Sequence, residues 1–201
     1  MSAKKLLMVF VKNSLPGYVK TRLAADVGTG KALEIYQRLL HQTLSVAAGA
    51  DAEKEIWYSA FIEKHDEANK KQFKKKLQQG ESLGERMKFS FYEAFGNGYH
   101  KVVIIGSDCP ELTSDIVNEA FRLLDSAGLV IGPSEDGGYY LLGTSRYIPS
   151  LFEEVDWSTE NVMPQTLEKA KKKSLSVRFL PKLNDVDTLE DLKKSRFFQD
   201  G

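Results

Sequence analysis

The amino-acid sequence predicts an α/β fold in which a mostly parallel sheet carries helices on both faces. The apolar run at residues 6–11 and the segment at 101–106, which contains "VVII", are typical of strands that are buried on both sides. Strand-like runs alternate along the chain with segments whose apolar residues recur at helical spacing, as they do in βαβ units. The chain has no internal repeat and no linker long enough to divide it. We therefore expect one domain over residues 1–201.

The first half of the chain begins with the strand at 6–11. A basic loop follows, which contains Pro16 and Gly17 and ends near residue 23. A helix is expected over 30–48, where apolar residues recur on one side. The next predicted elements are a strand at 55–61, a charged helix at 64–76 and an amphipathic helix at 82–95.

The second half begins with the strand at 101–106, after which Asp108 precedes a sharp turn at Pro110. A helix over 114–126 has Thr113 or Ser114 as its expected N-cap. The remaining predicted elements are strands at 128–134 and 138–144 separated by "SEDG", a helix at 161–173, a strand at 176–180 and a helix at 188–195.

The composition favours a small ligand over a polymeric one. Lys+Arg and Asp+Glu number 28 each, so no overall positive field attracts nucleic acid or an anionic membrane. Cys109 is the single cysteine of the sequence, which excludes an intramolecular disulfide and a cysteine-based zinc site. The N-terminal apolar run at 6–11 is too short for a signal-peptide core or a membrane span. We expect a cytoplasmic protein without a membrane span, and the sequence indicates no oligomeric state.

The basic loop after the first strand is a candidate phosphate site. It supplies the cations Lys12, Lys20 and Arg22 and the hydroxyl group of Thr21. Arginine can grip two phosphate oxygens at once, and lysine adds a mobile point charge, so the loop suits a diphosphate. Ligands of such sheets bind beyond the carboxyl ends of the strands, which is where this loop lies. The alternative is a solvated surface loop.

Asp108 is a candidate metal ligand, because it follows a buried strand at the same edge of the sheet. A single acid there suits Mg²⁺ or Mn²⁺, which is held by few carboxylates together with ligand phosphates and water. Asp185 or Asp187 could supply a further carboxylate. The alternatives are structural: Asp108 would cap the turn before the helix at 114–126, and Asp187 with Thr188 would cap the last helix.

A third candidate site lies between the strands at 128–134 and 138–144. Glu135 and Asp136 precede Gly137 and Gly138, and glycines permit a ligand to approach the backbone closely. Either acid could accept a proton from an acceptor hydroxyl or contact a sugar. An Asp-Gly pair is also the ordinary signal of a hairpin turn, which is the competing interpretation.

Five segments together resemble a bacterial family within the glycosyltransferase-A, or nucleotide-diphospho-sugar transferase, superfamily. They span residues 9–192 in the family's order and read "VFVKNSLPGYVKTRL", "QQGESLGERM", "IIGSDCPELT", "GPSEDGGYYLLG" and "LNDVDTLEDL". Some members of the family are labelled as glycosyltransferases of arsenosugar biosynthesis. More distantly, the chain is similar to the guanylyltransferases that activate phospholactate and to the molybdenum-cofactor nucleotidyltransferases.

The resemblance implies a Rossmann-like, glycosyltransferase-A-type fold with a nucleotide along the N-terminal part of the sheet. It also assigns roles to residues. Those expected to bind the nucleotide are Lys12, Lys20, Thr21 and Arg22 at the phosphates and Gln79, Gly80, Gly84 and Arg86 near the base or ribose. Those expected at the transferred group or acceptor are Asp136, Glu135, Gly137, Gly138 and Tyr139. The expected metal ligands are Asp108 and Asp187, since Ser107-Asp108-Cys109 lacks the second acid of a D-x-D motif.

Three functions fit these residues. The favoured one is a glycosyltransferase that moves a sugar from a nucleotide-sugar to a small acceptor, with Mg²⁺ or Mn²⁺ on the diphosphate and Asp136 or Glu135 as the base. The second is a nucleotidyltransferase, in which a phosphorylated small molecule attacks a nucleoside triphosphate and pyrophosphate leaves. The third is a nucleotide-binding module that catalyses no reaction.

Overall fold

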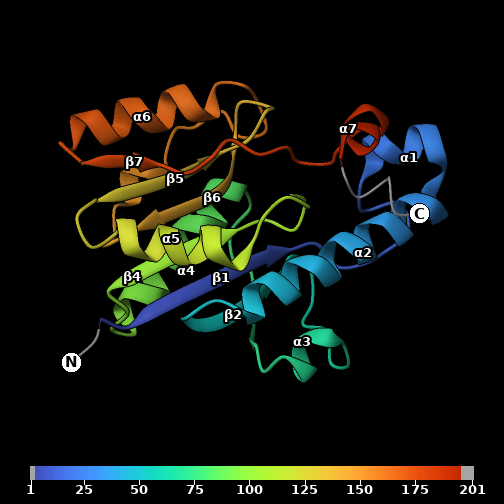
Figure 1. The fold of residues 1–201 in the computed structure, drawn as a ribbon, viewed down its shortest axis with the longest axis horizontal. Helices are drawn as coiled ribbons and strands as arrows, with labels where there is room; N and C mark the ends of the chain where they lie inside the picture. The colour runs from blue at the N-terminus through green and yellow to red at the C-terminus, as the bar shows by residue number, and fades with distance from the viewer. Residues whose placement is uncertain (1–2, 196–201) are drawn as a thin grey trace.

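Residues 3–195 of the chain are described by a computed structural model, in which seven strands form one sheet in the order β3-β2-β1-β4-β6-β5-β7 (Figure 1). All neighbouring strands are parallel except β6, which is antiparallel to both β4 and β5. The predicted fold class is therefore confirmed. The strands are β1 (Lys5–Val11), β2 (Glu53–Tyr58), β3 (Lys74–Leu77), β4 (Lys101–Ile105), β5 (Leu129–Pro133), β6 (Tyr139–Thr144) and β7 (Val177–Phe179).

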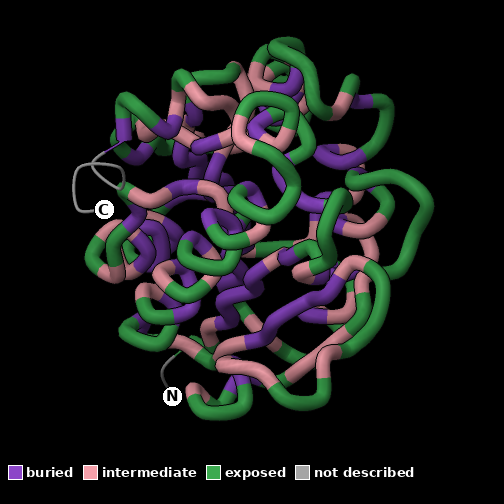
Figure 2. Tube along the Cα trace, turned by 90° about the vertical axis from the view of Figure 1, so that its right-hand side faces the viewer, coloured by how far each residue is buried: buried purple, intermediate pink, exposed green. Residues whose placement is uncertain are grey.

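Helices cover both faces of this sheet. They are α1 (Thr21–Val27), α2 (Thr29–Ala48), α3 (Glu67–Lys70), α4 (Leu83–Gly96), α5 (Ser114–Leu123), α6 (Val162–Lys172) and α7 (Leu189–Lys194), with a 3₁₀ turn at Pro149–Leu151. In β1, Leu7 and Val9 pack in the core beneath α2 and α5, whereas Leu6 and Met8 pack in the core beneath α4 and α6. This alternation is the two-residue period of a strand that is buried on both sides. Figure 2 shows the buried residues gathered inside the molecule and the exposed ones around them.

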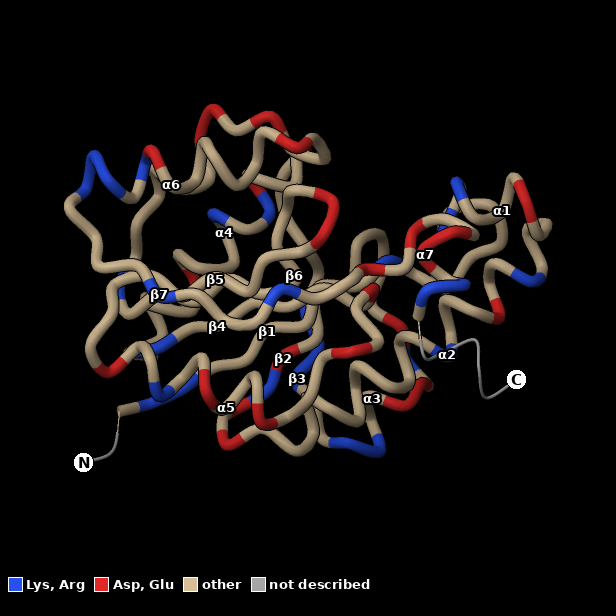
Figure 3. Tube along the Cα trace, turned by 45° about the horizontal axis from the view of Figure 1, so that its top comes forward, with Lys and Arg blue, Asp and Glu red and all other residues tan. Residues whose placement is uncertain are grey.

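A small lobe extends beyond the carboxyl end of β1. It consists of α1, α7 and the first half of α2, which lie together at one end of the molecule in Figures 1 and 3. The lobe has its own apolar cluster, in which Leu23 of α1, Ile35 of α2 and Leu192 of α7 are buried with Val186. Both signs of charge are spread over the lobe and the sheet body (Figure 3).

The predicted charged helix at 64–76 is wrong. Only the single turn of α3 is helical, and the chain then forms the edge strand β3, which pairs with β2 in parallel. The cause is tertiary, because Lys76 of β3 lies 3.1 Å from the buried carboxylate of Glu55 in β2 and its ammonium lies 4.9 Å from the ring centre of Trp57. A row of lysines at a sheet edge also blocks pairing with another chain.

The basic loop was predicted to continue to residue 23, but helix α1 begins at Thr21. The predicted strands and helices of the second half are present with bounds shifted by a few residues, and β5 and β6 form an antiparallel hairpin. No helix among the described residues is both long enough and apolar enough to span a membrane.

Asn13 holds the carboxyl edge of the sheet together. Its buried side chain accepts hydrogen bonds from the backbone N–H groups of Ala60 at 3.0 Å and Phe61 at 3.3 Å, and donates one to the carbonyl oxygen of Phe61 at 2.9 Å. The segments that leave β1 and β2 are thereby joined. These hydrogen bonds satisfy backbone groups of the segment after β2. They thereby fix that segment beside the end of β1, at the edge where ligands of such sheets bind.

We predict that Asn13→Ala lowers the free energy of unfolding by about 1–2 kcal/mol, because it removes three hydrogen bonds from partly buried backbone groups. Urea denaturation measures the effect. Ser14→Ala at the neighbouring position is the control and is expected to stay within about 0.5 kcal/mol of the unsubstituted protein. Equal effects of the two substitutions would contradict the role given to Asn13.

Candidate functional site

A cavity of about 660 Å³ opens at the carboxyl ends of β1, β2, β3 and β4. This is the edge at which parallel sheets bind ligands. Apolar side chains of its wall include Phe10, Leu15 and Leu83. Five of the residues predicted from the sequence line it, which are Lys12, Lys20, Arg86, Asp108 and Asp187. The structure therefore brings together parts of the predicted phosphate, base and metal sites.

The centre of the site is an ion pair between Lys20 and Asp108. The ammonium of Lys20 lies 2.6 Å from Oδ1 of Asp108 and donates a hydrogen bond of 2.5 Å to the carbonyl oxygen of Val186. Only 3% of the Lys20 side chain is exposed, whereas Asp108 is half-exposed. The backbone N–H of Val186 also donates to the carbonyl oxygen of Asp108 at 2.9 Å. Three segments far apart in the sequence thus meet at this ammonium.

A second ion pair lies beside the first. Nη1 of Arg22 is 3.2 Å from Oδ2 of Asp187; the Arg22 side chain is largely exposed, and that of Asp187 is half-exposed. Thr21, between Lys20 and Arg22, is exposed at the first position of α1. The two predicted phosphate-binding cations Lys20 and Arg22 therefore each hold one of the two predicted metal ligands.

The other two cations of the cavity are less engaged. Lys12 follows β1 directly, is exposed and has no ion pair within residues 3–195. Arg86 of α4 donates only through Nε, to the carbonyl oxygen of Gly80 at 3.0 Å, which leaves the rest of its guanidinium group for a ligand. These two side chains are the ones placed to grip phosphate oxygens in the cavity.

Tyr36 and Gln78 belong to the cavity wall but were not predicted. The hydroxyl of Tyr36 accepts a hydrogen bond from the backbone N–H of Lys12 at 3.0 Å and donates one to the carbonyl oxygen of Lys12 at 2.8 Å. Burial raises the pKa of this hydroxyl, and Asp108 adds to the effect. Gln78 donates to the carbonyl oxygens of Val11 and Trp57, where β1 and β2 end. In the sequence, Tyr36 is one of several apolar residues on a helix face and carries no separate signal.

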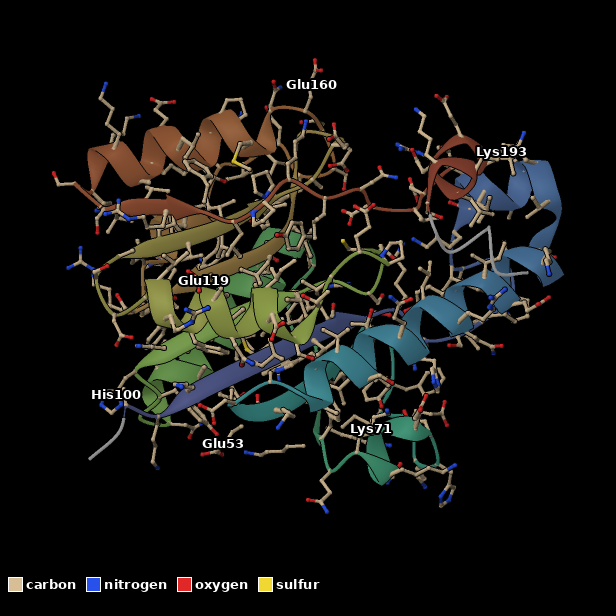
Figure 4. All side chains as sticks on the ribbon, viewed as in Figure 1. Glu53, Lys71, His100, Glu119, Glu160 and Lys193 are labelled. Carbon is tan, nitrogen blue, oxygen red and sulfur yellow. The ribbon has the colours of Figure 1, made fainter. Side chains whose placement is uncertain are left out.

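The hairpin between β5 and β6 places Asp136 in a turn. Its carboxylate accepts hydrogen bonds from the hydroxyl of Ser134 and from the backbone N–H of Gly138 at 2.9 Å. Gly137 has φ +89°, and a Cβ atom there would lie 2.9 Å from Cα of Glu160, so the turn needs a glycine at this position. Figure 4 shows Glu160 near the start of α6. This hairpin turn is the competing structural interpretation of the segment, and it stands beside the predicted role.

Glu135 and Tyr139 flank the turn outside the cavity. The carboxylate of Glu135 is 2.7 Å from the ammonium of Lys182 and borders a separate groove of about 400 Å³. The hydroxyl of Tyr139 is buried without a hydrogen-bond partner, and its ring meets Trp157 edge-on at 6.4 Å. Burial raises the pKa of Tyr139. The structure does not bring these two side chains into the cavity with Lys20 and Asp108.

The segment before α4 has a local structure of its own. Ser82 and Glu85 form a capping box, which fixes the start of α4 and so places Arg86 beside the cavity. Gln79 is exposed, and Gly80 has φ +127° and contributes the carbonyl oxygen that Arg86 contacts. The wall of the cavity does not include Gln79, Gly80 or Gly84. Their predicted contact with the nucleotide stays a prediction.

The acids at this edge offer oxygen ligands of the type that Mg²⁺ and Mn²⁺ prefer. Asp108 and Asp187 line the cavity, and the buried Oδ1 of Asp185 has no hydrogen-bond partner. Within the described residues, however, no group of three or more His, Cys, Asp or Glu side chains could hold a metal ion alone. A metal ion here must take its other ligands from nucleotide phosphates and water, as Mg²⁺ commonly does.

Asp185 is the acid with the most perturbed pKa of this edge. Burial raises its pKa to about 7, and the charges of Asp108 and Asp136 add to the effect, while Lys20 opposes it. Asp185 lies next to Val186, which is anchored to both Lys20 and Asp108, and its Oδ1 atom is buried although the residue as a whole is partly exposed. In the sequence, Asp185 was an alternative to Asp187 as a metal ligand.

We predict that Asp185→Asn stabilises the protein relative to the unsubstituted chain at alkaline pH. Between pH 4 and pH 7, roughly, the folded state holds a proton on Asp185 that the unfolded state has already released. The free energy of unfolding therefore falls as the pH rises through this range. Asparagine does not titrate, so the variant does not lose this stability. The difference in unfolding free energy should therefore grow across this range and level off above it, in denaturation curves without metal. A difference that is constant with pH would contradict the assignment.

We also predict that Gly84→Ala destabilises the protein by about 1–3 kcal/mol, because the added methyl group overpacks the contact between α4 and the segment after the 3₁₀ turn. A Cβ atom at Gly84 would lie 2.4 Å from Nε1 of Trp157 and 2.5 Å from the carbonyl oxygen of Phe152. The control is Gly96→Ala at the other end of α4, where a Cβ atom meets nothing within 4 Å. Denaturation midpoints that fall equally in both variants would refute the packing role.

Comparisons with solved structures support the same fold. A protein of Desulfovibrio desulfuricans G20, provisionally named a nucleotide-diphospho-sugar transferase, is 37% identical to this chain, with a TM-score of 0.86 over 95% of this chain and 85% of that one. The inositol-1-phosphate CTP transferase of T. maritima is 12% identical, with a TM-score of 0.63 over 99% and 95% of the two chains. Rv0371c of Mycobacterium tuberculosis H37Rv, solved in complex with manganese, is 13% identical, with a TM-score of 0.56 over 96% and 97%. The last two show the fold alone.

The resemblance seen in the sequence is thereby confirmed: this chain has the fold shared by nucleotide-diphospho-sugar transferases and nucleotidyltransferases. Among curated proteins, none matches the sequence. Residues 42–159, which are more than half of the chain, match the family described as an uncharacterized protein conserved in bacteria, DUF2064. The chain belongs to the DUF2064 family.

Proposed function

We propose that this protein is a metal-dependent transferase with a nucleotide-activated donor, and that it moves a sugar from a nucleotide-sugar to a small acceptor. The observation that carries the proposal is the cavity at the carboxyl edge, where Lys12 and Arg86 lie in one wall with Asp108 and Asp187. Cations that can grip a diphosphate and acids that can hold its metal ion are the two requirements of such a donor site. The 37% identical relative supports sugar as the transferred group.

The donor is held by residues of the first half of the sheet. Lys12 and Arg86 bind the diphosphate oxygens, while the apolar surface of Phe10, Leu15 and Leu83 offers contact area for a base or ribose. Tyr36 fixes the backbone of Lys12 through two hydrogen bonds, so this cation starts from a defined backbone position. A site whose groups are already in place binds with a smaller loss of conformational freedom.

Asp108 and Asp187 would hold Mg²⁺ or Mn²⁺, which neutralises the charge that develops on the leaving nucleotide. The acceptor is expected on the side of the β5–β6 hairpin. Asp136 is the proposed base there, and its charge raises the pKa of Asp185, as that of Asp108 does. Gly137 and Gly138 are proposed to lie against the acceptor, and Glu135 would assist Asp136 after release from Lys182.

Nucleotidyl transfer is the second candidate, and a specific observation favours it. Both predicted base residues are engaged, Glu135 with Lys182 and Asp136 with Ser134 and Gly138. Nucleotidyl transfer to a phosphorylated substrate needs cations more than a base, because the attacking phosphate is already ionised. The T. maritima protein, which is named as a CTP transferase, shares this fold, so the fold is compatible with nucleotidyl transfer.

The proposal is tested by thermal unfolding with Mn²⁺ in the presence of nucleoside diphosphates, nucleotide-sugars and nucleoside triphosphates. A ligand at about 100 times its dissociation constant should stabilise the protein by ~2.7 kcal/mol, which shifts the midpoint by several degrees. The shift should be lost in Asp108→Asn. The control is Asp26→Asn, the same change at an exposed residue of α1 outside the cavity wall, where the shift should persist.

Product analysis then separates the functions. Release of a nucleoside diphosphate from one nucleotide-sugar identifies sugar transfer, and release of pyrophosphate from a triphosphate identifies nucleotidyl transfer. Binding without turnover of any donor, with a full panel of sugar and phosphate acceptors, would favour the non-catalytic module. A midpoint that no nucleotide moves would refute the donor site.

A further inference from the structure

Each candidate metal ligand of the cavity is already paired with a cation of the same short segment. Lys20 pairs with Asp108 at 2.6 Å and Arg22 pairs with Asp187 at 3.2 Å. The two cations stand on either side of Thr21, where α1 begins. Their surroundings differ sharply, because 3% of the Lys20 side chain is exposed but 71% of the Arg22 side chain is. Solvent screens the second pair far more than the first.

Lys20 is also held in place from several sides. Its backbone has φ 49° and ψ 45°, a left-handed conformation that costs free energy for a residue with a side chain. Its ammonium has a second partner in the carbonyl oxygen of Val186 at 2.5 Å. Val186 in turn is bonded through its N–H to the carbonyl oxygen of Asp108. These contacts hold the buried ammonium beside Asp108.

A divalent cation on Asp108 must share this carboxylate with the ammonium of Lys20. Like charges at such short range repel each other, and little water surrounds the Lys20 ammonium to screen this repulsion. The phosphates of a nucleotide change this balance, because their oxygens attract both the metal ion and the ammonium. The metal ion and the Lys20 ammonium therefore repel each other before the nucleotide binds, and the phosphates compensate this repulsion afterwards.

We propose that Lys20 is the resident counter-ion of Asp108, and that it suppresses binding of the free metal ion until nucleotide phosphates enter the cavity. Metal and nucleotide then bind cooperatively, and by thermodynamic linkage each raises the affinity for the other. Lys20 is thus a positioning residue that sets the order of binding. This inference rests on the proposed function, in which Asp108 is a metal ligand.

The experiment measures binding of Mn²⁺ to the nucleotide-free full chain, from the electron paramagnetic resonance signal of unbound Mn²⁺. We compare the unsubstituted protein with Lys20→Gln, which removes the charge and retains a hydrogen-bond donor, and with Lys20→Met, which removes both. Arg22→Gln is the matched control, since it removes the same charge from an exposed pair. Asp108→Asn identifies which sites depend on Asp108.

We expect Lys20→Gln to bind Mn²⁺ about tenfold more tightly or better at the Asp108-dependent site, because the repulsion between the Lys20 ammonium and the metal ion is removed. Arg22→Gln should change the affinity by much less. Should Lys20→Met fail to fold, as circular dichroism would show, Lys20→Gln alone carries the test.

Two outcomes overturn the inference in distinguishable ways. If Lys20→Gln binds Mn²⁺ no more tightly than the unsubstituted protein, while Asp108→Asn still abolishes the nucleotide-dependent thermal shift, then Lys20 does not suppress metal binding and the proposed function stands. If nucleotides stabilise the unsubstituted protein equally with and without Mn²⁺, then the ammonium replaces the metal ion permanently. In that case both the inference and the metal requirement of the proposed function are refuted.

Discussion

The ion pair between Lys20 and Asp108 is the interaction on which the architecture of the site depends. It joins the end of β4 to the start of α1, and the second bond of the ammonium adds the segment that leads to α7. The lobe and the sheet body are thereby fixed to each other at the point where the cavity opens. Loss of Asp108 would leave the buried ammonium of Lys20 without its charged partner, whereas the intact pair adds little net stability because solvent reaches Asp108. A role in the site explains the pair better than a role in stability.

The strands and most helices follow from local pattern, because the pattern and the structure have the same cause. After their first residue, β1 and β4 are continuously apolar because both of their faces are buried, and Leu6 and Leu7 lie in different cores. The edge strand β3 has no apolar pattern that would predict a strand. Its sequence is largely lysine, and it becomes a strand because Glu55 and Trp57 of the neighbouring strand hold Lys76. Helix α1 has one buried residue, Leu23, and depends on the lobe around it.

In the site, too, some features follow from the sequence and others depend on tertiary contacts. Topology alone places the basic loop and Asp108 at one edge, so their proximity could be predicted. Which charges pair could not, because the partners Val186 and Asp187 come from the far end of the chain. Glu135 and Asp136 are adjacent in sequence, yet one forms an ion pair with Lys182 and the other is hydrogen-bonded within the turn. Tyr36 gave no signal, since a core position and a cavity wall look alike on a helix face.

The charges of the cavity wall point to the form in which a donor would enter. Lys12, Lys20 and Arg86 are matched by Glu81, Asp108 and Asp187, three cations against three acids. A bare diphosphate would give such a balanced site an excess of negative charge, and a bare divalent cation would give it an excess of positive charge. Together the two offset one another. A wall that is neutral by itself therefore discriminates against each component alone and accepts them as a complex, which is the behaviour that a counter-ion on Asp108 produces.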